Sequence, residues 1–128
     1  KKKNQGKKGS FRIDMLDKTI LRKQNEFSKI YNKGKTITSE YVVVFYIKNE
    51  LGYNRRAFIA SKKIGNSVER NRARRLIREF YRKNNDNLKK SCDYIFVAKR
   101  KMILKKAKSH DVEKSLTKVL SSKNILKG

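Results

Sequence analysis

Cysteine, histidine and proline are scarce in this chain of 128 residues. It has no proline, one cysteine, Cys92, and one histidine, His110. A lone cysteine excludes an intrachain disulfide and, with the missing proline and abundant lysine, predicts an intracellular, cytoplasmic protein. One cysteine and one histidine without a local signature also argue against a cysteine nucleophile with a histidine base. We therefore expect Cys92 to be a small core or strand-edge residue.

Acidic residues and long apolar runs are scarce as well. No stretch approaches the roughly 18 apolar residues of a membrane-spanning helix. The 11 acidic residues are scattered singly, with Asp111 and Glu113 the closest pair. Phosphodiester hydrolysis by a protein usually needs clustered carboxylates that hold metal ions, or a histidine acid–base pair. Zinc-ligand clusters and the glycine spacing of a phosphate-binding loop are also missing. The sequence therefore predicts a binding protein with no catalytic residues, no metal site and no organic cofactor of its own.

Positive charge, in contrast, is abundant. The chain has 36 lysines and arginines and a net charge of +25. Such a charge repels itself in the folded state and is tolerated where a polyanion neutralises it. Hydrophobic residues make up 37% of the chain, enough to form the core of a single domain. Nucleic acid is the expected partner. RNA ranks ahead of DNA because strands are expected to flank the most basic helix, and ahead of a membrane surface because the apolar face of that helix is needed for the core.

The most basic stretch, residues 61–83, predicts a helix with two different faces. Asn66 and Glu69 have the spacing of a capping box at its start. Apolar residues recur at helical period and the arginines fall mainly on the opposite side. The planar guanidinium holds phosphate at two points, so this side suits a polyphosphate backbone. A merely solvated face is the alternative, but the pairs of opposite charge expected there are nearly absent. The apolar positions are Ala73, Leu76, Ile77, Phe80 and Tyr81.

The remaining patterns predict an α/β sandwich, a mixed sheet with helices packed on it. The run at 40–48 is almost continuously apolar, which indicates a strand that is buried on both faces or central in the sheet, and turn residues after it predict a hairpin with 55–61. We expect a basic arm at 1–20, a single RNA-binding domain at 21–122 and a C-terminal tail at 123–128. The other expected elements are helices at 23–33 and 111–120, a short strand at 36–38 and a strand at 93–99.

Three segments resemble the bacterial ribonuclease P protein family. The run SKKIGNSVERNRARRLIRE, residues 61–79, is similar to the family signature, with its Arg-Asn-Arg core at Arg70-Asn71-Arg72. NEFSKIYNKGK, residues 25–35, resembles the first helix and the glycine after it, and DYIFVAKR, residues 93–100, resembles the last strand. The resemblance covers roughly residues 22–120.

This resemblance implies a fold and a function. The fold would be an α-β-β-β-α-β-α sandwich with a mixed four-stranded sheet and a left-handed β-α-β crossover, against the general right-handed rule. The function would be that of the protein subunit of an endoribonuclease, bound 1:1 to ribonuclease P RNA. That RNA, with Mg²⁺ held mainly by RNA and substrate, would remove the 5′ leader of precursor tRNA. A non-catalytic ribosomal or RNA-assembly protein and a self-sufficient nuclease are the alternatives.

The resemblance also assigns roles to individual residues. Contact with the catalytic RNA falls on Lys62, Lys63, Asn66, Arg70, Asn71, Arg72, Arg74, Arg75 and Arg78. Phe27, Tyr31 and Phe45 would line the cleft that binds the leader. Without the resemblance, Phe27 and Tyr31 would be interpreted as core residues packed on the sheet. Tyr31 stands where phenylalanine is common in the family, and the segment before residue 22 is longer and richer in lysine, which leaves its role open.

Overall fold

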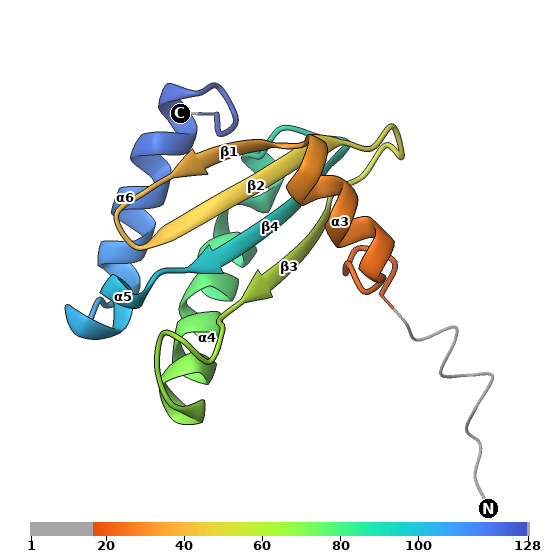
Figure 1. Cartoon of the computed structure of the whole chain (residues 1–128). Helices are drawn as coiled ribbons and strands as arrows, with labels where there is room; N and C mark the ends of the chain where they lie inside the picture. The colour runs from red at the N-terminus through yellow and green to blue at the C-terminus, as the bar shows by residue number, and fades with distance from the viewer. Residues whose placement is uncertain (1–16, 128) are drawn as a thin grey trace, which may run out of the picture.

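The computed structural model describes residues 17–127, so most of the expected basic arm at 1–20 lies outside the described residues (Figure 1). The element order α-β-β-β-α-β-α is confirmed, with an unpredicted short helix, α5, before the last helix. The elements are α3 (Gln24–Lys33), β1 (Lys35–Thr38), β2 (Val42–Lys48), β3 (Arg55–Ile59), α4 (Ser67–Asn84), the 3₁₀ turn η1 (Asn85–Asn87), β4 (Cys92–Ala98), α5 (Arg100–Leu104) and α6 (Ser109–Ser122).

The four strands form one mixed sheet in the order β1-β2-β4-β3. β2 is antiparallel to both β1 and β4, and β3 is parallel to β4. The predicted hairpin between 40–48 and 55–61 is therefore wrong, because β4 lies between the two strands. The turn itself was correctly predicted: Glu50 and Gly52 have positive φ angles of 58° and 84°. The apolar residues on both sides of β2 instead fit its position between two neighbours.

The connection from β3 through α4 to β4 is a left-handed β-α-β crossover. In Figure 1, α4 lies behind the sheet, and along the direction of the arrows β4 is to the right of β3. Seen from the helix side, the chain therefore moves to the left, which is a left-handed crossover. The general rule strongly favours the right-handed form, so the resemblance predicted a feature that general rules would have missed.

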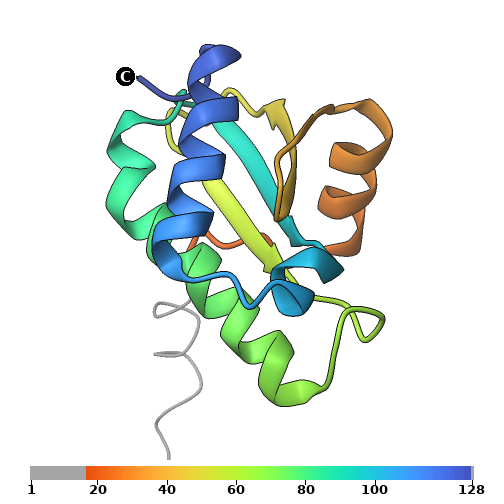
Figure 2. The same cartoon turned by 90° about the vertical axis from the view of Figure 1, so that its left-hand side faces the viewer.

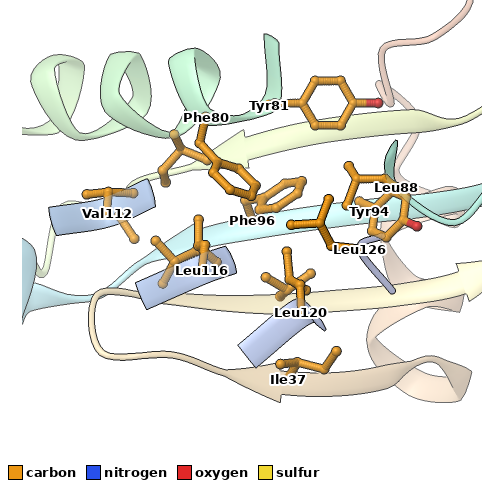
Figure 3. Packing of buried hydrophobic residues seen from close by; sticks show 14 of the residues in the cluster. Ile37, Phe80, Tyr81, Leu88, Tyr94, Phe96, Val112, Leu116, Leu120 and Leu126 are labelled. Carbon is orange, nitrogen blue, oxygen red and sulfur yellow. The ribbon is translucent and has the colours of Figure 1, made fainter. Parts of the chain in front are cut away.

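One face of the sheet is covered by α4 and α6 (Figure 2). Alternate residues of the strands point to it, among them Val44 of β2 and Phe96 of β4. Phe80 of α4 and Leu116 of α6 pack against them in a single cluster (Figure 3). Cys92, at the start of β4, is buried in the same cluster, as predicted.

The other face of the sheet carries only α3. Leu21, Ile30 of α3, Ala57 and Ile95 form a second, smaller cluster there. Figure 2 shows α3 on this side, with the other two long helices opposite. Because one helix of 10 residues cannot cover the whole face, several apolar side chains of the sheet stay only partly buried. These are Phe45, Ile47, Ile59 and Val97, with Phe27 of α3 beside them.

Packing extends past the predicted domain limits of 21 and 122. The N–H of Leu21 donates to the carbonyl of Arg56, and the N–H of Arg56 to the carbonyl of Thr19. At the other end, Ile125 and Leu126, expected in a tail, are buried in the main core. Within residues 17–127, no helix is long and apolar enough to cross a membrane.

Candidate nucleic-acid interface

The start of α4 is fixed by the predicted capping box. The N–H of Glu69 donates to the Asn66 side chain, and the N–H of Asn66 donates to the Glu69 carboxylate, both at 2.8 Å. Gly65 makes this possible, since a Cβ there would lie 2.5 Å from Oε1 of Glu69. The cap sets the helix register, which determines the residues that face the core and those that face outward.

Four of the five predicted apolar positions of α4 are buried, and the fifth, Leu76, is partly buried against the same core. Ala73, Ile77, Phe80 and Tyr81 are at most 8% exposed. Because these positions hold the helix on the sheet, the opposite side is presented to solvent over its whole length. The arginines and lysines there are expected to form one continuous positive surface.

The arginines of this surface differ in what they already bind. Nη2 of Arg72 donates to the carbonyl of Ala107 at 2.9 Å, which ties α4 to the segment before α6. Arg74 donates to the carbonyl of Ala60, after β3, and to Asn71. Arg75 and Arg78 are exposed. Arg72 and Arg74 are therefore partly structural. Arg75 is exposed, and the guanidinium of Arg78 lies 5.8 Å from the ring centroid of Phe58.

The other signature residues join the exposed group. Lys62, Lys63 and Asn66 lie in the exposed segment that leads into α4, and Asn71 is exposed on its first turns. Arg70 is half-buried, with Nε donating to the carbonyl of Asn66 at 3.3 Å. The structure thus brings the predicted RNA-contact residues together along one side of α4 and its N-terminal loop.

The aromatic residues lie on the partly covered face of the sheet. Tyr31 of α3 is 44% exposed, and its ring centroid is 4.9 Å from that of Phe45 at an interplanar angle of 78°. Phe27 is partly buried against the smaller core cluster, and Ile30 between them is fully buried. Core packing and an exposed binding face, the two interpretations of α3, therefore each hold for some of its residues. Ile30 is a core residue, Tyr31 is a surface residue and Phe27 is intermediate. We call Phe27, Tyr31 and Phe45 the aromatic cleft.

The aromatic cleft and α4 meet at the edge of the sheet. A cavity of about 300 Å³ is lined by Phe27, by Ile59 of β3 and by Arg78 of α4. Phe27 and Arg78 lie far apart in the sequence, and β3 at the sheet edge brings them to the same hollow. Rings and cations therefore lie together, as in grooves that bind single-stranded nucleic acid.

The sequence analysis missed the ion pairs that hold α3 in place. Arg55 of β3 donates from Nε and Nη2 to both oxygens of Asp93, at 2.8 and 2.7 Å, and from Nη1 to Glu26 of α3 at 2.6 Å. Asp93 is only 5% exposed, and Asn49 also donates to it. An acidic residue inside an apolar strand was the available signal, because buried carboxylates need a partner. This network joins α3, and with it Tyr31, to the sheet.

Protonation of Glu26 is coupled to this network. Burial alone would raise the pKa of Glu26, but hydrogen bonds from the N–H groups of Lys23 and Arg22 and the charge of Arg55 together lower this pKa below its ordinary value of 4.5. The hydrogen bond to Asp93 conversely raises the pKa of Arg55. The ion pair between Glu26 of α3 and Arg55 is therefore formed at neutral pH.

A second basic surface was also missed, because α5 was not predicted. Arg72 reaches Ala107 just beyond α5, so α5 lies beside α4. Lys101 of α5 forms an ion pair with Glu40, with Nζ 3.3 Å from the carboxylate. Five of the six basic side chains of this segment are exposed, and the sixth, Lys99, is half-buried and donates from Nζ to the carbonyl of Ser39. The basic residues of this segment are Lys99, Arg100, Lys101, Lys105, Lys106 and Lys108.

The acidic side chains of the described residues do not gather into a metal site. Across residues 17–127, no three histidine, cysteine, aspartate or glutamate side chains gather into a group that could hold a metal ion. The carboxylates of Glu26 and Asp93 are paired with Arg55. A divalent cation at this surface would therefore need its ligands from a bound partner.

Comparison with known proteins gives the same family at three levels. The family model Ribonuclease P matches residues 15–124. The ribonuclease P protein component of Thermoanaerobacter sp. (strain X514) is 39% identical over 108 residues, covering 84% of this chain and 91% of that protein. The component from Fusobacterium nucleatum is 41% identical over 108 residues, covering 83% and 97%.

Solved structures agree with these sequence relatives. The RNase P protein of Staphylococcus aureus superposes with a TM-score of 0.75 at 28% identity, covering 87% of this chain and 100% of that one. The RNase P protein of Thermotoga maritima superposes with a TM-score of 0.72 at 27% identity, covering 84% and 97%.

Proposed function

The chain belongs to the ribonuclease P protein family, and we propose that it binds the catalytic RNA of ribonuclease P through α4. The aromatic cleft would bind the 5′ leader of precursor tRNA. The protein would act in the cytoplasm as one copy per RNA subunit, and hydrolysis would belong to the RNA. The observation that carries this proposal is the division of α4 into a buried apolar face and an exposed face of arginines.

The two surfaces suit two different RNA targets. The exposed side of α4 is a long positive ridge, which fits the phosphates of a folded RNA. The aromatic cleft presents an exposed ring, Tyr31, against Phe45, and unpaired bases stack on such rings. A leader is single-stranded, whereas mature tRNA lacks it. The protein would therefore distinguish precursor from product by the cleft and not by α4.

Mg²⁺ enters this proposal as an ion held by RNA and substrate. When bound there, it supplies a water or hydroxide nucleophile and stabilises charge on the phosphate. The residues described do not form a ligand set of their own. The chain contributes lysine and arginine charges, which offset repulsion between the phosphates of the two RNAs and so favour their close approach.

The first prediction concerns the dependence of cleavage on RNA. The pure protein should leave 5′-labelled precursor tRNA intact, and reconstitution with a bacterial ribonuclease P RNA should restore cleavage at a lower Mg²⁺ concentration than the RNA needs alone. The measurement is the cleavage rate across a Mg²⁺ titration. Cleavage by a preparation freed of RNA would establish a self-sufficient nuclease instead. An unchanged Mg²⁺ requirement would support the alternative of an RNA-assembly protein.

The second prediction concerns the exposed ring of the cleft. Tyr31→Ala should weaken binding of precursor tRNA by the holoenzyme about tenfold, because stacking of a base on a ring is worth about 1–3 kcal/mol. Binding of mature tRNA should stay the same. Tyr31→Phe, which keeps the ring, is the matched control and should behave like the unmodified protein. If Tyr31→Ala leaves the ratio of the two dissociation constants unchanged, the leader does not use this ring.

A further inference from the structure

A second, larger cavity lies at the same edge of the sheet. Its volume is about 620 Å³, within the usual range for ligand pockets. It lies between residues 17–19, the turn from β2 to β3, and the C-terminal half of α4. The residues that matter for its chemistry are Tyr53, Arg56, Phe58, Arg78, Arg82 and Lys90. We call it the edge cavity.

The edge cavity is strongly positive, and its guanidinium groups are held in place by rings. Arg56 lies over the ring of Tyr81 at 5.4 Å, and Arg78 over the ring of Phe58 at 5.8 Å. The cavity lining includes one carboxylate, Asp17, which is 3.7 Å from Arg56. Four cations against one anion leave a surplus of positive charge, so the cavity suits a phosphate group.

One donor in the cavity wall is left without a partner. Nε of Arg56 is buried and has no hydrogen-bond partner among residues 17–127. A buried N–H group of this kind costs free energy unless something accepts its hydrogen bond. Nε itself is shielded from the cavity, but the incompletely satisfied guanidinium of Arg56 favours an anion beside its other nitrogen atoms.

The cavity also has a ring that a base could stack on. Tyr53, in the turn before β3, is half-buried, with Nζ of Lys18 at 4.5 Å from its ring centroid. A half-exposed ring flanked by cations is the arrangement by which proteins hold one base and its phosphate. The chemistry of the edge cavity therefore points to a nucleotide unit of single-stranded RNA.

The edge cavity continues directly from the aromatic cleft. Arg56, Phe58 and Arg78 line both the edge cavity and the smaller hollow that contains Phe27. A strand that leaves the cleft at Phe27 would pass these shared residues and reach Arg82. Arg82 lies 16 residues after Asn66 in the sequence, roughly 24 Å along α4 at 1.5 Å per residue. The cavity is thus at the far end of α4 from the signature loop.

From this continuity we propose that the edge cavity holds leader nucleotides that lie beyond those in the aromatic cleft, farther from the cleavage site. The inference rests on the proposed function, because it needs the leader to occupy the cleft first. A long leader would pass around the β3 edge and gain additional contacts from Tyr53, Arg82 and Lys90. A short leader would end before it reaches them.

The test compares two precursor tRNAs whose leaders have about 4 and about 16 nucleotides, the range of site sizes of single-strand grooves. The holoenzyme should bind the long leader more tightly than the short one. Tyr53→Ala should weaken binding of the long leader about tenfold and so remove that gain. The double variant Arg82→Ala with Lys90→Ala should remove it as well. For the double variant, the logarithmic salt slope with the long leader should shrink by about 1.4, since each phosphate contact of a single strand contributes roughly 0.7.

The matched control removes two lysines from the outer side of α6, Lys114→Ala with Lys118→Ala, and should leave the gain intact. Thermal melting checks the fold of every variant. Equal losses for long leader, short leader and mature tRNA would overturn the inference in favour of contact with the catalytic RNA. No difference between the two leaders in the unmodified protein would overturn it as well. The proposed function fails separately, if the short leader and mature tRNA bind equally well.

Discussion

Replacing Lys63, Arg70 and Arg75 together by alanine is expected to weaken binding of a ribonuclease P RNA by about a thousandfold. Each contact between a cation and a phosphate is worth about 1.5 kcal/mol or more, and three such losses approach 4.5 kcal/mol, where 1.4 kcal/mol is about tenfold. Lys63, in the loop before α4, and Arg75 of α4 are exposed, and Arg70 of α4 is half-buried. The logarithmic salt slope should fall by roughly three units.

The choice of residues follows from what each arginine binds. Arg72 and Arg74 are left out because they donate to the carbonyls of Ala107 and Ala60 and so hold neighbouring segments. Arg78 is left out because it lines both cavities at the β3 edge. Arg70 donates to the carbonyl of Asn66, which lies at the start of the same helix, so its loss unties no neighbouring segment. A loss of affinity in the triple variant would therefore come mainly from RNA contact and not from the fold or the leader.

The matched control for the triple variant removes three lysines from α6 and the turn after it: Lys114, Lys118 and Lys123, all exposed. Both triple variants lose the same charge, so general electrostatic attraction falls equally. Thermal stability should change little in either, since surface substitutions usually stay within about 0.5 kcal/mol each. Equal losses of RNA affinity in the two would show that net charge, and not the arginine side of α4, carries the binding.

Features that depend on residues close in sequence were predicted well. The capping box of Asn66 and Glu69 and the buried face around Ile77 follow from spacing alone. The pairing of strands did not follow, because the turn at Asn49–Gly52 is compatible with a hairpin, whereas the insertion of β4 depends on the whole sheet. The left-handed crossover has no local signal either; only the family resemblance predicted it.

In the candidate site, too, the sequence predicted local features but not those that depend on distant segments. Phe27 and Tyr31 were predicted on one side of a helix, and they are. The two rings differ in exposure because α3 lies over one end of the sheet only. That position depends on Arg55 and Asp93, which lie 38 residues apart. Contacts of this kind form between distant segments, so helical or strand period does not reveal them.

The ion pairs of Arg55 give the second large expected effect. Arg55→Met should lower the free energy of unfolding by about 3 kcal/mol, because removing one partner leaves the buried Asp93 carboxylate without its counter-charge. The same variant should weaken precursor binding more than mature-tRNA binding, because Glu26 loses its link to the sheet and α3 carries Tyr31. The measurements are denaturant unfolding and the ratio of the two dissociation constants.

Two controls separate charge from packing in this prediction. Lys48→Met, at an exposed position at the end of β2, removes a nearby cation and should change stability by less than about 0.5 kcal/mol. Adding Asp93→Asn to Arg55→Met removes the unpaired charge and should recover a large part of the lost stability. If Arg55→Met unfolds at the same denaturant concentration as the unmodified protein, the network is not what positions α3.

The dependence of stability on pH tests the same network without a substitution. The folded pKa of Glu26 lies below its ordinary value of 4.5, so its contribution is complete above about that pH and is lost as the pH falls through the lower folded value. Part of this lowering comes from Arg55. Between pH 5 and pH 3, Arg55→Met should therefore lose less stability than the unmodified protein. Identical losses would mean that the N–H groups of Arg22 and Lys23 alone hold the carboxylate, and α3 would then be positioned by Ile30 and its apolar neighbours.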